Sequence, residues 1–129
     1  MSVPVSLGDL PAHVLAFGLG PYLVTVDSDR APRTTSVSVS WHGDTLVAGL
    51  GTRTAANVRE NRAVTLLWPA PASGGYALIV DGWAEVPETA DAPVDVVIHP
   101  ERAVLHVTRG PVVPLSFSSV ARRMRDTCI

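Results

Sequence analysis

The segment VAGLGTRTAANVREN, residues 47–61, carries the residue types in this chain best suited to bind a phosphate group. An apolar run ends there, Gly49 and Gly51 follow, and a Thr-Arg-Thr triplet at 52–54 opens a helix-like stretch. Glycines let the backbone approach an anion closely, and the free N–H groups of a helix N-terminus favour negative charge. The spacing predicts either a phosphate-binding corner between a strand and a helix, or glycines that only relieve crowding there.

The same glycines match part of the G-x-G-x-x-G fingerprint of dinucleotide-binding folds, but their setting excludes that fold. Thr54 stands where the fingerprint requires a third small residue. The preceding strand, TLVAGL, is expected to be the return arm of a hairpin rather than the first strand of a βαβ unit. The strand after the helix, AVTLLW, leads into PAPA without the Asp or Glu that would hold a ribose hydroxyl.

The composition indicates one packed domain, 1–129, and argues against nucleic acid as a partner. Hydrophobic residues make up 47% of the 129 residues and charged residues 17%, which is enough apolar material for a core. The net charge of -2 leaves no basic footprint for a nucleic acid. All ten basic residues are arginine, so every permanent side-chain cation can bind phosphate as a bidentate fork.

Neither a metal site nor a disulfide is expected. Cys128 is the single cysteine, and the four histidines show no zinc-binding spacing. The first residues lack the basic region of a signal peptide, and no apolar run approaches the ~20 residues that span a bilayer. We therefore expect a cytoplasmic protein with no membrane partner.

The alternation of apolar and polar residues predicts a mainly β domain with very short connections. We expect an opening helix over about 8–18, a barrel over about 21–114, and a tail helix over about 115–129. The segment RTTSVSVSWHGD is expected to be one half-buried strand, and VDVVI and RAVLHVTR to be two strands separated by HPE. Six or seven strands joined by turns of two to five residues must pair antiparallel, which favours a small barrel.

Six segments in this order resemble the flavin-binding split barrels related to pyridoxamine 5'-phosphate oxidase. The segments are LVTVDSDRAP, TTSVSVSW, TLVAGLG, TRTAANV, ENRAVTLLW and VDGWAEV, between about 22 and 86. The resemblance implies a six-stranded antiparallel Greek-key split barrel with one or two short helices. It also implies a homodimer that binds FMN, or the deazaflavin coenzyme F-420, at the dimer interface.

The resemblance implies which residues contact the cofactor. The phosphate-binding Ser and Arg of the family fall on Thr52 and Arg53, its Lys falls on Thr54, and its Asn falls on Asn57. The residues of the second strand that line the flavin ring or phosphate fall near Thr35, Val37, Ser38 and Ser40. The complete set of expected contacts is Thr35, Val37, Ser38, Ser40, Ala48, Gly49, Thr52, Arg53, Thr54, Asn57 and Trp68.

Two departures from the family pattern reduce the positive charge of this site. Thr54 replaces a lysine, and a basic residue often found in the second strand is absent, with Ser40 in that region. Each charge-assisted hydrogen bond is worth roughly 1–3 kcal/mol, so losing two weakens phosphate binding by one to a few orders of magnitude. Arg33 is a further candidate to contact the phosphate.

The function that the resemblance implies is a flavin-dependent oxidoreductase acting on a small molecule whose identity stays open. A flavin carries its own reactive atom, so no catalytic side chain is assigned. The alternatives are a deazaflavin-dependent reductase and a non-catalytic barrel that binds another ligand or only dimerises. Pyridoxamine phosphate oxidation itself is not expected, because the tail SFSSVARRMRDTCI lacks the Arg/His-bearing substrate motif of those enzymes.

The other candidate residues have simpler interpretations. Tryptophans can flank a flat ring, but burial in the core or at a dimer contact is the favoured role for all three. His106 is expected to be a core or edge histidine, and Asp81 and Glu85 to lie on a solvated strand face. The arginines of the tail form either a solvated helix face or an arm over the partner's pocket; they are Arg122, Arg123 and Arg125.

Overall fold

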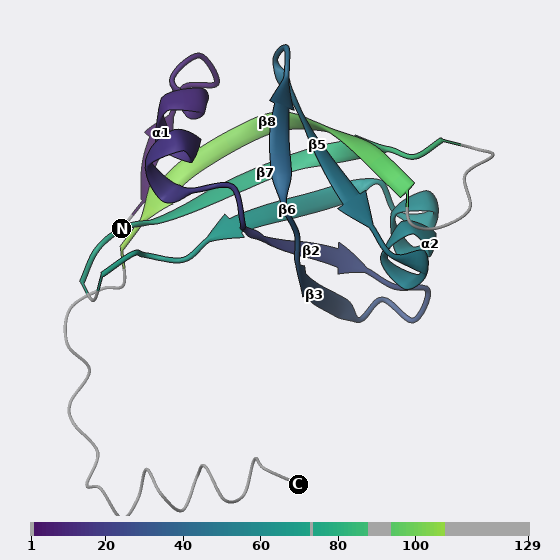
Figure 1. Ribbon diagram of the computed structural model, residues 1–129. Helices are drawn as coiled ribbons and strands as arrows, with labels where there is room; N and C mark the ends of the chain where they lie inside the picture. The colour runs from purple at the N-terminus through teal and green to yellow at the C-terminus, as the bar shows by residue number, and fades with distance from the viewer. Residues whose placement is uncertain (1, 73, 88–93, 108–129) are drawn as a thin grey trace, which may run out of the picture.

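The computed structural model of the chain describes residues 2–72, 74–87 and 94–107, and these form one curled antiparallel sheet with two helices (Figure 1). The strands are β1 (Ser2–Val5), β2 (Tyr22–Val26), β3 (Pro32–Ser36), β4 (Val39–His42), β5 (Thr45–Leu50), β6 (Ala63–Trp68), β7 (Ala77–Glu85) and β8 (Val94–His106). The helices are α1 (Leu10–Phe17) and α2 (Thr52–Glu60). The expected tail helix and its arginines lie outside the described residues.

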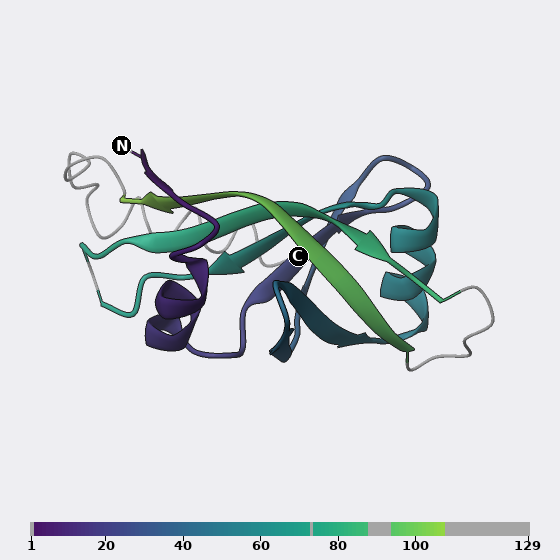
Figure 2. The same ribbon diagram turned by 90° about the horizontal axis from the view of Figure 1, so that it is seen from above.

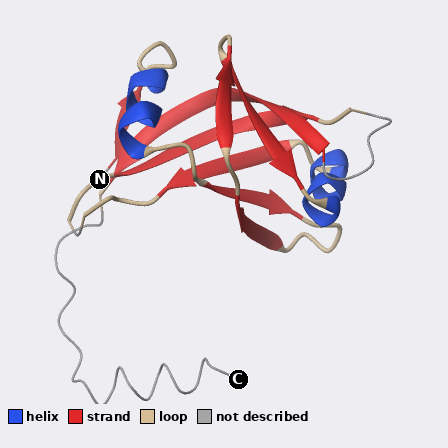
Figure 3. Cartoon of the chain, viewed as in Figure 1, coloured by secondary structure: helices blue, strands red, loops and turns tan. Residues whose placement is uncertain are grey.

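The strand order confirms a mainly β split barrel. Neighbouring strands run β3-β2-β6-β7-β8-β5-β4, every pair is antiparallel, and β1 adds to β8 outside this path. The sheet curls around one apolar interior, and the helices lie near its two ends (Figures 2 and 3). α1 lies within the segment 8–18 where an opening helix was expected, and α2 begins at the Thr-Arg-Thr triplet that was expected to open a helix. The sequence reading missed β1, a short strand that contains a proline.

The segment expected to be one strand over RTTSVSVSWHGD is two strands, so that prediction was wrong. β3 pairs with β2, whereas β4 pairs with β5 at the other end of the strand order. Between them the Val37 N–H donates to the Pro21 carbonyl (3.0 Å) and the Val39 N–H to the Leu19 carbonyl (2.9 Å). The chain changes there from pairing with β2 to pairing with β5, so this segment joins the two ends of the strand order.

The opposite correction applies to β8, which runs without a break where two strands were expected. Pro100 has no N–H to donate to the ladder, and a strand tolerates such a residue at an irregularity. The pairing of β7 with β8 shifts register between Asp81 and Gly82, and Gly82 pairs with Pro100. The backbones approach so closely there that a Cβ on Gly82 would lie 2.3 Å from the His99 carbonyl oxygen. The HPE segment is therefore part of an irregular ladder and not a turn.

The core fills the concave side of the sheet and fixes both helices. Leu10 and Val14 of α1, and Ala55 and Val58 of α2, are each at most 1% exposed. The largest fully buried side chains of the sheet are Leu23, Leu46, Leu50, Leu66, Trp68, Leu78, Val80, Val96 and Ile98. Burying one such side chain stabilises the fold by roughly 1.5–3 kcal/mol. No described helix is both long and apolar enough to span a membrane.

Candidate functional site

A cavity of about 440 Å³ lies between the β2–β3 hairpin and α2. Its walls come from segments that are far apart in sequence but adjacent in the barrel. The lining residues are Thr25, Asp27, Arg33, Thr34, Thr35, Arg53, Thr54, Ala56 and Asn57. Two guanidinium groups, four threonine hydroxyls and one amide make this lining rich in hydrogen-bond donors.

The hairpin is shaped by the Asp27 carboxylate, which directly follows β2. Its Oδ1 accepts hydrogen bonds from the N–H groups of Asp29 and Ala31, both at 2.9 Å. The Asp27 backbone bonds to the same turn, because its N–H donates to the Ala31 carbonyl and its carbonyl accepts from the Arg30 N–H. Arg30 has φ 64°, a left-handed conformation that glycine usually supplies. This tight turn begins the cavity wall that β3 continues.

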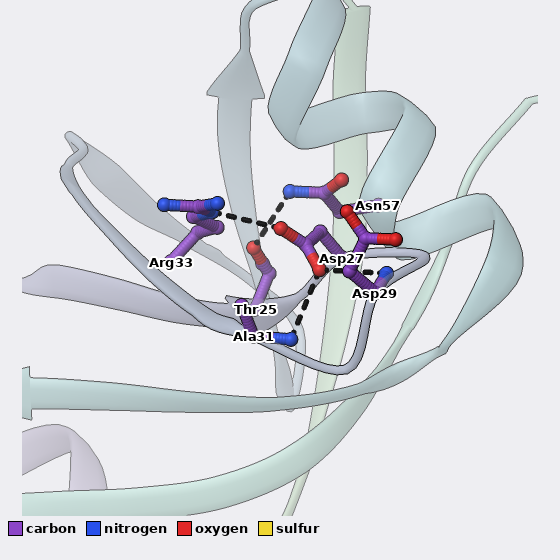
Figure 4. A network of polar contacts seen from close by, with 6 residues as sticks. All are labelled: Thr25, Asp27, Asp29, Ala31, Arg33 and Asn57. Atoms are coloured by element: carbon purple, nitrogen blue, oxygen red, sulfur yellow. Dashed lines mark hydrogen bonds and ion pairs between the residues drawn. The ribbon is translucent and has the colours of Figure 1, made fainter.

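Arg33, on β3, is held against this turn (Figure 4). Its Nε donates to Asp27 Oδ2 at 2.8 Å, and the Arg33 side chain remains 64% exposed while that of Asp27 is only 15% exposed. The hydrogen bond from the Ala31 N–H, and then the one from Arg33, lower the pKa of Asp27 below its usual value. Asp27 is therefore a carboxylate at neutral pH.

The opposite wall is the N-terminal half of α2. The buried residues Ala55 and Val58 fix one face of this helix on the sheet, which leaves Arg53 and Ala56 exposed on the other side. The N-cap is Gly51, whose extended backbone offers no side chain to cap the first turn, and that turn contains no acidic residue. The first N–H groups of the helix are thus not satisfied by a capping side chain, an arrangement that favours a bound anion.

Asn57 and Thr25 close the base of the cavity. Asn57 Nδ2 donates to Thr25 Oγ1 at 3.3 Å, which joins α2 to β2 (Figure 4). Thr25 is 1% exposed and is the only polar residue among those fully buried in the described part of the chain. This contact joins the two walls of the cavity at the buried Thr25.

Four of the residues expected to contact a cofactor line this cavity: Thr35, Arg53, Thr54 and Asn57. Arg33 lines it as well. The sequence did not predict four further lining residues: Thr25, Asp27, Thr34 and Ala56. Of these, only Asp27 carries a local sequence signal, since it is an aspartate in a turn segment with an arginine six positions later.

The remaining expected contacts do not line the cavity in a single protomer: Val37, Ser38, Ser40, Ala48, Gly49, Thr52 and Trp68. Ala48 and Trp68 are 1% and 2% exposed and belong to the core, where Trp68 Nε1 donates to the Gly18 carbonyl at 2.7 Å. Ser38 is exposed between β3 and β4, and Ser40 is exposed on β4. Their expected contact with a cofactor stays a prediction.

The other candidate residues lie away from the cavity lining. Trp83 stacks on His99 with ring centroids 4.1 Å apart, and His99 Nε2 lies 3.1 Å from Glu85 Oε1. Asp81 is separately engaged, since its Oδ1 accepts from Thr65 Oγ1 at 2.7 Å. His106, half-buried at the end of β8, hydrogen-bonds Ser2 across the β1–β8 edge. The described residues include no cluster of side chains suited to a metal ion.

Comparisons with known proteins identify the fold and the relatives of the chain. An uncharacterized protein of Mycobacterium bovis is 36% identical over 107 residues, which cover 72% of this chain and 74% of the relative. An uncharacterized protein of Mycobacterium tuberculosis matches equally well. No family model matches the sequence.

Solved structures give the same architecture at lower identity. A candidate pyridoxamine 5'-phosphate oxidase of Listeria innocua is 23% identical, with a TM-score of 0.62 over 78% of this chain and 98% of its own. An F-420 reductase is 22% identical, with a TM-score of 0.55 over 66% and 88%. A FAD-binding protein of Mesorhizobium loti is 16% identical, with a TM-score of 0.61 over 81% and 94%.

Fold and topology therefore define the class of this protein as a split barrel, the fold that it shares with these solved structures. Within that class, the chain belongs to the same sequence family as the two mycobacterial proteins.

Proposed function

We propose that the cavity between the β2–β3 hairpin and α2 binds the phosphate of a flavin coenzyme, and that the protein is a flavin-dependent oxidoreductase. One observation carries this proposal: Arg33 and Arg53, from segments twenty positions apart, line one cavity at an uncapped helix N-terminus. The structural relatives include an F-420 reductase and a FAD-binding protein, which supports a flavin-type ligand.

The donor set of the cavity fits a phosphate. Two guanidinium cations and one carboxylate leave the lining with one net positive charge, and the carboxylate is already occupied by two backbone N–H groups and Arg33. Hydroxyl groups of Thr34, Thr35 and Thr54 add neutral donors. A charge-assisted contact contributes roughly 1.5–3 kcal/mol, so two arginines are enough for measurable binding even without the family lysine.

Residues of this chain would bind and orient the coenzyme, and the bound flavin would supply the electron transfer chemistry. We expect the cavity residues to hold the phosphate end, and Val37 and Ser38, between β3 and β4, to contact the coenzyme together with Ser40 of β4. FMN is the proposed coenzyme; the likeness to an F-420 reductase makes the deazaflavin the alternative. The substrate class is a small molecule that accepts or donates a hydride.

We also propose that two copies associate through the convex side of the sheet. Direct cross-strand partners place Tyr22, Leu67, Ile79 and Val104 in one row across β2, β6, β7 and β8. Their sequence neighbours, such as Leu66 and Leu78, point into the core, so this row points outward. Tyr22 is 43% exposed and the other three are half-buried, which leaves an apolar stripe suited to a second copy.

Purified protein tests the proposed function directly. Protein with bound flavin is expected to absorb near about 450 nm, and protein with bound deazaflavin near about 420 nm, values that follow from the coenzymes themselves. If the protein is colourless, titration with FMN and then with coenzyme F-420, followed by fluorescence, is expected to give saturable binding of one of them. Absence of binding by both would contradict the proposal and favour the non-catalytic alternative.

A further inference from the structure

The ion pair between Asp27 and Arg33 uses only part of the arginine. The contact runs from Nε to Asp27 Oδ2, and among the described residues no partner is found for the terminal Nη atoms. A guanidinium group has five N–H donors in a rigid fork. Since Nε is bound to Asp27, the four N–H groups of the two Nη atoms remain, and the two that face outward form an edge that can bind an anion.

The geometry fixes where this outer edge lies. The Asp27 side chain is held in place, because its other oxygen, Oδ1, accepts hydrogen bonds from the N–H groups of Asp29 and Ala31. The carboxylate is thus part of the turn, and it holds one edge of the exposed guanidinium group beside the cavity that both residues line (Figure 4). Without this contact the long side chain of Arg33 would be free to adopt many rotamers in solvent.

We propose that Asp27 is a positioning residue, which holds Arg33 so that its outer guanidinium edge binds the coenzyme phosphate in the cavity. This inference rests on the proposed function of the cavity and assigns Asp27 a role that the family motif does not include. It makes a counterintuitive prediction. Coulomb's law alone says that removing an anion from an anion-binding cavity strengthens binding, whereas loss of a positioning residue weakens it.

The variant Asp27→Asn separates the two effects. The amide oxygen of Asn still accepts from Asp29 and Ala31, so the turn is kept, but its NH₂ group replaces the oxygen that faces Arg33 Nε. Two donors then face each other and the contact is lost. Arg33→Lys is the complementary variant, because it keeps the positive charge. Its single ammonium group lacks the planar set of N–H donors with which a guanidinium group can bind Asp27 and a phosphate at the same time.

The experiment measures dissociation constants for FMN and for riboflavin, which lacks the phosphate, in five proteins: the parent, Asp27→Asn, Arg33→Ala, the double variant of these two changes, and Arg33→Lys. We expect Asp27→Asn to weaken FMN binding roughly fivefold, the equivalent of part of one charge-assisted contact. Riboflavin binding is expected to stay unchanged. In the Arg33→Ala background the Asp27→Asn change is expected to have no further effect, because Asp27 acts through Arg33. Arg33→Lys is expected to bind FMN as weakly as Asp27→Asn.

Several results would overturn the proposal. Unchanged FMN binding by Asp27→Asn would mean that Asp27 does not position Arg33 for the phosphate, and tighter binding would mean that Asp27 only repels the phosphate. A parallel loss of riboflavin binding would mean that Asp27 only supports the fold. A parent protein that binds no FMN would contradict the proposed function as well as this inference. The nitrogen NMR signal of Arg33 Nε distinguishes these failures, because a shift between parent and Asp27→Asn reports the ion pair independently of any flavin.

Discussion

Replacement of Gly82 by alanine tests the interpretation of the irregular β7–β8 ladder. A Cβ at this position would lie 2.3 Å from the His99 carbonyl oxygen, 3.1 Å from its carbonyl carbon and 3.2 Å from Pro100 Cα. All three atoms belong to the backbone of the neighbouring strand, so no side chain can rotate away. The strands must separate by about 0.7 Å to reach the 3.0 Å below which real Cβ contacts essentially never occur.

Such a separation strains the longest pairing in the sheet. Overpacking of a fixed site costs about 1–3 kcal/mol, and the upper end applies here because the obstacle is backbone. The gain from a less flexible unfolded chain offsets about 0.4–1 kcal/mol of this. We expect Gly82→Ala to lower the free energy of unfolding by about 2 kcal/mol, and the melting temperature by roughly 6–10 °C in a domain of this size.

Urea or thermal unfolding followed by circular dichroism measures this effect, with Gly8→Ala as the matched control. Nothing lies within 4 Å of a Cβ built at Gly8, and its φ is not positive, so the control is expected to stay within about 0.5 kcal/mol of the parent. Equal stability of Gly82→Ala and the parent would refute the close approach of β7 and β8, and with it the account of β8 as one unbroken strand.

Three further predictions concern charge and assembly. Thr54→Lys restores the lysine of the family pattern and is expected to tighten FMN binding several-fold at low salt in fluorescence titrations. This gain is expected to shrink as the ionic strength rises, because salt screens the added charge. An unchanged affinity would mean that position 54 does not face the phosphate. Ile79→Glu puts a charge in the convex apolar row, and light scattering is expected to show a monomer in place of a homodimer. The control Leu15→Glu, at a position 82% exposed on α1, is expected to leave the homodimer unchanged. A dimer in both variants would mean that the interface lies elsewhere. Folding lowers the pKa of Asp27, so the stability that its charge contributes is complete above the unfolded-state pKa of about 4 and is lost as the pH falls through the folded-state pKa. The difference in unfolding free energy between the parent and Asp27→Asn is therefore expected to shrink below about pH 4 in urea titrations. A difference that stays constant with pH would contradict the charged state of Asp27.

Local sequence patterns predicted the helices and strands of this protein better than which strands pair with each other. The alternation through Val37, Val39 and Trp41 correctly predicted which side chains turn inward. It could not show that the strand breaks at Val37, because the break depends on hydrogen bonds to residues 19 and 21 on another segment. The sequence likewise could not show that HPE lies within one strand, because Pro100 is tolerated in β8 only opposite Gly82, a residue of the neighbouring strand.

The candidate site shows the same limit. Arg53 and Asn57 followed from the resemblance of one contiguous motif, and the structure places both at the cavity. Thr25 was missed because its partner, Asn57, is 32 positions away in sequence. Trp68 was expected to contact the cofactor, but its indole N–H bonds to Gly18 inside the core, fifty positions away in sequence. Composition and spacing carry no information on such long-range contacts.

The most direct test of the central claim, that the cavity binds a coenzyme phosphate, is the FMN affinity of Arg53→Ala compared with Arg62→Ala. Both arginines are exposed and close in sequence, but only Arg53 lines the cavity. Loss of one charge-assisted contact is expected to raise the dissociation constant of Arg53→Ala roughly tenfold, while Arg62→Ala stays within about twofold of the parent. Equal affinities for FMN in the two variants would contradict the claim that this cavity holds the phosphate.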